Sequence, residues 1–173
     1  KSKGNVIDPL NLIESYGADA LRMTLAAHAA QGRDIKLSES RVEGYRNFTT
    51  KLWNAARFCE MNGCQYDPSF EPENCNETIN KWIVGMVSET AFQISLGIDN
   101  YKFNEAAGSA YQFTWGTFCD WYIEFSKPIF YGEDECAKKE TQATAAWVLD
   151  QLMRLLHPFM QFITEELWHN FRS

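Results

Sequence analysis

The chain has 173 residues, of which 45% are hydrophobic and 23% are charged, so it can bury one sizeable core and does not have the composition of a disordered chain. No apolar run reaches the roughly eighteen residues of a membrane span, and no signal-peptide pattern follows the first residues, which together predict a cytoplasmic protein. The net charge of −7 argues against a surface that binds nucleic acid all over.

Helical patterns follow one another along nearly the whole chain. Asp8 followed by Pro9 is typical of a helix start and predicts a short helix that ends near Gly17. Ser40 and Glu43 have the spacing of a capping box near the start of a longer helix. Further helices are expected over residues 18–30, 39–61, 78–98, 104–127, 134–156 and 159–171. Gly32 would stop the first of these, Pro128 would disturb the helix that precedes it, and Asp134 would cap the helix over 134–156.

No segment shows the alternation of a strand, so the predicted fold class is all-α, a helix bundle. Residues 64–75 contain two prolines and no periodicity, which indicates a loop. In the helix expected over 104–127, aromatic residues recur at spacings of three and four. We interpret them as a core seam and not as a base-stacking surface: Tyr111, Trp115, Phe118, Tyr122 and Phe125.

The five cysteines are expected to be free, buried thiols, because their number is odd and they form no Cys-x-x-Cys pair. The cysteines that could join one metal site are Cys59, Cys64 and Cys75. No histidine lies near them in the sequence, so we expect no metal site.

The helix expected over residues 39–61 has two contrasting sides. Between Arg33 and Arg57 the chain carries six basic and three acidic residues, a local basic patch on an acidic body. A helical wheel places Tyr45, Phe48, Leu52, Ala55 and Cys59 on one side. An arc of about 140° on the other side holds Arg46, Asn47, Thr50, Lys51, Asn54, Arg57 and Phe58.

Cations, side-chain amides and one aromatic ring together suit an unpaired RNA loop, whose phosphates, base edges and base faces they can contact. The alternative is an ordinary solvated surface, with Phe58 reaching a neighbouring helix. The wheel leaves both interpretations open.

Several stretches resemble class I aminoacyl-tRNA synthetases of the valine, isoleucine and leucine group. They read KSKGNVIDP at residues 1–9, YGADALR at 16–22, FCDWYIE at 118–124 and LHPFMQFITEELW at 156–168. Gln161 stands where the family usually has a second proline. The stretches GRDI at 32–35, GYRNF at 44–48 and KLWNAARF at 51–58 are more similar to the valine enzymes than to their isoleucine and leucine relatives.

This resemblance implies two parts. Residues 1–36 would be the end of a Lys-Met-Ser-Lys-Ser loop with its connecting helices, and residues 37–173 an anticodon-binding helical bundle, which we expect to be cut short at its C-terminus. Lys1 would be the remnant of the loop that contacts ATP phosphates in the full enzyme. The anticodon-binding residues implied are Arg46, Lys51, Asn54, Arg57 and Phe58.

The full-length enzyme would use ATP and Mg²⁺ to attach valine to tRNA(Val), mainly reading the second and third anticodon bases. We expect a monomer, and we expect the fragment alone to be inactive and to bind no cofactor, because the nucleotide-binding fold is missing from this sequence. Two alternatives stay open: the equivalent domain of an isoleucine or leucine enzyme, and a non-enzymatic helical scaffold or interaction bundle.

Overall fold

A computed structural model describes residues 7–30, 32 and 34–172 of the chain. Lys1, which we predicted to contact ATP phosphates in a full-length enzyme, lies outside these described residues. Within them the secondary structure is helical, with no strand, which confirms the all-α fold class.

Two short helices come first. α1 spans Pro9–Tyr16, and the Asp8 carboxylate accepts a hydrogen bond from the Leu10 N–H at 2.9 Å, as expected of an N-cap. Gly17, at φ +87°, ends α1 and leads directly into α2, Ala18–His28. α2 stops two residues before the predicted end, because Ala29 leaves the helical conformation before Gly32 is reached.

The long helix α3 spans Glu39–Met61, the bounds that the sequence predicts. The predicted capping box is wrong, however. Ser38 is the N-cap and its side chain makes no capping hydrogen bond, so Ser40 lies inside the first turn, where it cannot cap the helix.

After the short 3₁₀ turn η1, Pro72–Asn74, helix α4 spans Thr78–Asp99. The next helix runs unbroken through three segments: α5 (Phe103–Gln112), the π-helical η2 (Phe113–Tyr122) and α6 (Ile123–Phe130).

The predicted end of this helix before Pro128 is wrong, because Pro128 lies within α6. The π-helical stretch also explains why the aromatic seam is only partly buried. Its wider turns rotate the following side chains relative to a regular 3.6-residue helix. Phe118 and Tyr122 are fully buried, whereas Phe125 is 49% exposed.

Two helices complete the bundle. α7 spans Glu135–Leu156 and is capped by Asp134, whose carboxylate accepts from the N–H groups of Cys136 and Ala137. α8 spans Gln161–Arg172. It begins two residues later than predicted, because the N–H groups of residues 159 and 160 both bond to the Leu156 carbonyl in a tight turn after Pro158.

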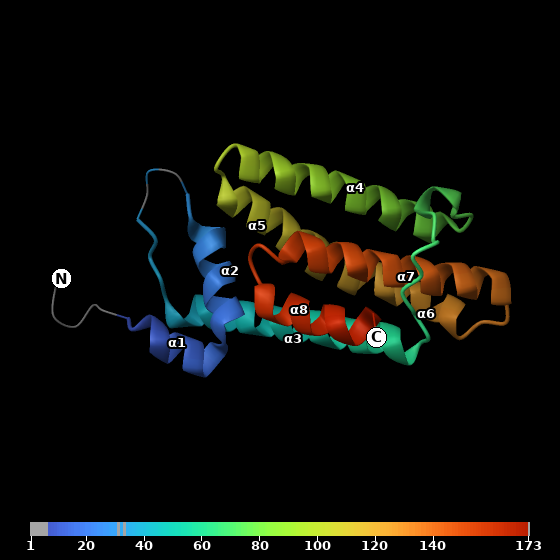
Figure 1. Ribbon diagram of the computed structural model, residues 1–173, viewed down its shortest axis with the longest axis horizontal. Helices are drawn as coiled ribbons and strands as arrows, with labels where there is room; N and C mark the ends of the chain where they lie inside the picture. Colours follow the sequence, from blue (N-terminus) through green and yellow to red (C-terminus); the bar gives the residue numbers. More distant parts are fainter. Residues whose placement is uncertain (1–6, 31, 33, 173) are drawn as a thin grey trace.

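Figure 1 shows α4 and α5 along one side of the bundle, α7 in the middle and α3 beside α8 along the opposite side. α1 and α2 pack across one end, and α2 contacts α3, α5 and α8. The core is centred on large side chains without solvent exposure: Phe48, Leu52, Ile83, Phe118, Tyr122, Leu149, Leu152 and Leu156. None of the helices in the described ranges is long and apolar enough to span a membrane.

Candidate nucleic-acid interface

The two sides of α3 are divided as the helical wheel predicts. Phe48, Leu52, Ala55 and Cys59 are buried, because they face the core formed by η2, α7 and the rest of the bundle. On the other side the polar residues are exposed to solvent: Arg46, Asn47, Thr50, Asn54 and Arg57.

Lys51 lies at one edge of this exposed side and is engaged by its own chain. Its Nζ forms an ion pair with Asp120 Oδ1 at 2.9 Å and lies 5.2 Å from the centre of the Trp115 ring. The hydrogen bond to Asp120 raises the pKa of the Lys51 ammonium above its ordinary value. The charge of Lys51 is therefore turned toward η2 and partly balanced there.

Phe58, at the same edge, is half-buried. Its ring lies 6.1 Å from that of Phe130 on α6, and the Lys127 ammonium lies 5.7 Å from its centre. Phe58 thus reaches a neighbouring helix, as one of the two interpretations of the wheel expects, although part of the ring stays accessible.

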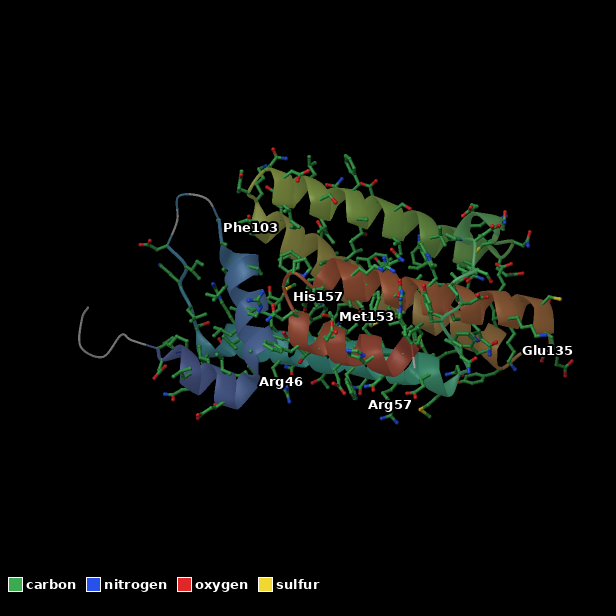
Figure 2. All side chains as sticks on the ribbon, viewed as in Figure 1. Arg46, Arg57, Phe103, Glu135, Met153 and His157 are labelled. Atoms are coloured by element: carbon green, nitrogen blue, oxygen red, sulfur yellow. The ribbon has the colours of Figure 1, made fainter. Side chains whose placement is uncertain are left out.

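Arg46 and Arg57 lie along the other edge of α3, on the same side of the bundle (Figure 2). Arg57 is paired only loosely, with its Nε 3.6 Å from Glu60 Oε2 and its side chain 59% exposed. A solvated pair of this kind contributes little stability, so the guanidinium can exchange its partner for a phosphate at low cost.

Two hollows lie between α3 and α8, and Trp53 lines both of them. The first has a volume of about 310 Å³ and is lined by Trp53, Ala56, Arg57, Glu60, Leu149, Met153, Leu167, Asn170 and Phe171. The second, with about 520 Å³, is lined by Arg46, Thr49, Thr50 and Trp53, with the start of α8 and the α1–α2 turn opposite. The two predicted arginines therefore each stand at the rim of a hollow.

Sequence reasoning missed Trp53, which falls just outside the polar arc of the wheel. A large aromatic ring between the apolar and polar sides of a helix was the signal available. It is typical of a side chain that covers the edge of a neighbouring helix or lines a groove.

α8, the second wall of both hollows, is held at each end by a buried acid. Asp19 on α2 accepts hydrogen bonds from two N–H groups in its first turn. At its other end Arg172 donates to Asp150 on α7, with Nη2 at 2.6 Å from Oδ1, and its guanidinium lies between the rings of Tyr66 and Trp168. These contacts fix α8 relative to α3.

No group of three or more potential metal ligands occurs among the residues that the structure describes. All five cysteines lie in this part of the chain and are free thiols, as predicted. Four of them are buried, but the expectation of a buried thiol is wrong for Cys136, which is exposed.

Comparison with known proteins gives two family matches. The family described as "Anticodon-binding domain of tRNA ligase" matches residues 80–173. The family described as "tRNA synthetases class I (I, L, M and V)" matches residues 1–38.

Two similar proteins carry the same name, valine–tRNA ligase. A valine–tRNA ligase of Brucella suis biovar 1 is 62% identical to this chain over 168 residues, and one of Bradyrhizobium diazoefficiens is 61% identical over the same length. Each alignment covers 97% of this chain but only 18% of the relative, so the chain spans less than a fifth of the length of these relatives.

A solved structure shows the same fold. It is a LeuRS of Agrobacterium radiobacter K84 in a ternary complex with tRNA and LeuAMS, and it superposes with a TM-score of 0.78 over 98% of this chain and 20% of that one. Sequence identity there is 22%, so this likeness concerns the fold alone.

Proposed function

We propose, from the premise that this chain belongs to the family of anticodon-binding domains of tRNA ligases, that it recognises the anticodon of tRNA(Val) within a full-length valine–tRNA ligase. The observation that carries the proposal is the exposed side of α3, where Arg46, Asn54 and Arg57 face solvent beside two hollows. The valine assignment is supported by the shared name of relatives that are 61–62% identical over nearly the whole chain.

The chemistry of α3 suits an RNA loop better than it suits an acidic partner or a small molecule. Arg46 and Arg57 can bind phosphates, and the Asn54 amide can both donate to and accept from base edges. Lys51 and Phe58 contribute from the η2 and α6 edge, where Lys51 would exchange part of its contact with Asp120 for phosphate. We keep all five as the anticodon-binding residues of the proposal.

The rest of the proposal concerns the full-length enzyme. There, ATP and Mg²⁺ would serve valine activation in the catalytic part, and Lys1 would contact the ATP phosphates. We place residues 1–36 with the end of that part and residues 37–173 in the anticodon-binding bundle. We also propose a cytoplasmic monomer, and no aminoacylation by this chain alone.

The test separates RNA recognition from amino-acid activation. In the full-length enzyme, the double variant Arg46→Ala/Arg57→Ala should leave valine-dependent ATP–pyrophosphate exchange unchanged. Its kcat/KM for tRNA(Val) should fall about tenfold or more, since phosphate and base contacts each contribute on the order of 1–3 kcal/mol. A matched control is Lys81→Ala, an exposed cation on α4, which should keep both activities. An unchanged kcat/KM for tRNA(Val) in the double variant would refute the assignment.

A further inference from the structure

We propose that the hollow between α3 and the end of α8 receives one unpaired base of the anticodon loop, held between the rings of Trp53 and Phe171. The inference rests on the proposed function and adds a subsite that the five residues named above do not define. It assigns roles to Trp53 and Phe171, which come from two helices and lie more than one hundred residues apart in the sequence.

The shape of the hollow fits one flat ring system. Its floor is made of buried apolar side chains from α3, α7 and α8: Ala56, Leu149, Met153 and Leu167. Ala56 has the smallest side chain of these four and therefore fills the least of the hollow. A volume of about 310 Å³ is at the lower end for ligand sites, so a nucleobase fits and a larger cofactor does not.

The walls and rim provide what an unpaired base needs. Trp53 and Phe171 are both half-buried, so each ring exposes part of its surface to the hollow, and aromatic rings bind the faces of unstacked bases. Arg57 at the rim supplies a charge for the adjoining phosphate. Glu60 supplies a carboxylate that can accept from an exocyclic amino group, which favours a base with an amino group on its Watson–Crick edge.

The contacts of Arg172 keep this arrangement rigid. Arg172 is adjacent to Phe171 and is fixed by its ion pair with Asp150 and by the rings of Tyr66 and Trp168. The last turn of α8 is thereby held against α7 before any ligand arrives. A site that is already ordered loses less conformational entropy on binding, and its affinity is higher for that reason.

An RNA loop is favoured over a peptide because the hollow continues into a row of exposed polar residues along α3. Arg46 and Arg57 are separated by about 16 Å along the axis of α3, a length that a few nucleotides can span. Thr50 and Asn54 lie exposed between them. By contrast, the apolar groove lined by Leu25, Ile98 and Phe159 has no basic residue to hold a phosphate.

The experiment uses the full-length enzyme and a synthetic stem-loop with the sequence of the tRNA(Val) anticodon arm. 2-Aminopurine replaces one loop base at a time, because stacking on an aromatic ring quenches its fluorescence. At one loop position, binding should quench the probe. Phe171→Ala should reduce that quenching, since only the Trp53 ring remains, and weaken binding about 5- to 100-fold. Phe92→Ala, which removes an exposed ring on α4, should change neither quantity.

A second variant covers the case in which Phe171→Ala does not fold. Ala56→Leu adds apolar volume to the floor while keeping every ring and charge, and it should reduce the quenching and the affinity in the same way. If both variants bind and quench like the wild type, or if no loop position is quenched, the hollow is not a base site. The proposed function is unaffected by that result if Arg46→Ala/Arg57→Ala still weakens binding. The proposed function itself is refuted if the wild-type enzyme does not bind the stem-loop at low salt.

Discussion

The carboxylate of Asp19 on α2 accepts a hydrogen bond from the backbone N–H of Ile163 on α8 at 2.7 Å, and one from Phe162 at 3.2 Å. Asp19 therefore caps a helix that begins more than 140 residues later in the sequence. It also ties residues 1–38, which match the class I synthetase family, to the helix that walls both hollows beside α3.

Replacing Asp19 should loosen α8. Asp19→Ala removes a buried cap from two N–H groups and should lower the free energy of unfolding by about 1–2 kcal/mol. Urea denaturation checks the stability, and hydrogen exchange should show faster exchange in the first turn of α8. The matched control is Asp8→Ala, because Asp8 caps α1 at an exposed site through a single N–H. An equal loss in both variants would show that Asp19 acts as an ordinary local cap.

Glu140 on α7 holds the segment that leads into α4, and its effect depends on pH. Burial raises the pKa of its carboxyl, but hydrogen bonds from Asn80 and from the N–H groups of Asn76 and Glu77 outweigh burial and hold the pKa below the ordinary value of 4.5. Since the folded-state pKa is depressed, the stabilisation is fully present above about pH 4.5 and is lost as the pH falls through the folded value.

Glu140→Gln should thus cost about 1–2 kcal/mol at pH 7, and the gap to the wild type should shrink as the pH drops below 4.5. Denaturant titrations at pH 7, 5 and 3.5 measure this gap. A constant difference across the three pH values would mean that the ionised form has no special role.

Asp120 should restrain RNA binding through Lys51, because it pairs with this cation at 2.9 Å. In the full-length enzyme, Asp120→Asn removes a negative charge beside the proposed interface and frees Lys51 for phosphate. Affinity for tRNA(Val) should rise about two- to tenfold, and the dependence on salt should steepen by about one unit of slope. The control is Glu105→Gln on α5, which breaks a similar pair with Lys102, the residue before α5. Weaker binding by Asp120→Asn would contradict this account.

The thiols should differ sharply in reactivity. Cys136 is exposed, while the other four cysteines are buried, and burial raises the pKa of the Cys119 thiol to about 12. At pH 8 the native chain should react with a thiol reagent at a single position, Cys136, because buried neutral thiols are poor nucleophiles. Cys136→Ser should remove this fast phase, and all five thiols should react after unfolding. A second fast-reacting thiol in the native state would contradict the burial of the other four cysteines.

Local signals in the sequence predict most of the fold. The caps at Asp8 and Asp134 lie next to the helices that they start, and the bounds of α3 agree with those expected from the sequence. The cap of α8 comes from Asp19, and the hydrogen bonds that hold the segment before α4 come from Glu140. Both acids are distant in sequence from the groups they bind, so no local pattern predicts these contacts. The π-helical turns of η2 are likewise set by packing, which is why the seam through Phe125 was only partly right.

The candidate site was predictable to the same extent. The helical wheel separates the buried and exposed sides of α3 correctly, because both are properties of one helix. It does not show that Lys51 meets Asp120, that Phe58 meets Phe130, or that Trp53 and Phe171 line the same hollow. Each of these depends on a second helix, whose position the sequence alone does not supply.

The central claim is that the exposed side of α3 reads the anticodon. The most direct measurement compares kcat/KM of the full-length enzyme for tRNA(Val) and for the same tRNA with its second and third anticodon bases replaced. Wild-type enzyme should prefer the natural anticodon by about tenfold or more for each good base contact. In Asn54→Ala, which removes a base-edge contact, most of that preference should disappear through loss of activity on the natural tRNA, whereas Arg57→Ala, which removes a phosphate contact, should lower kcat/KM for both tRNAs alike. If Asn54→Ala discriminates between the two tRNAs as the wild type does and Arg57→Ala leaves both kcat/KM values unchanged, α3 does not read the anticodon.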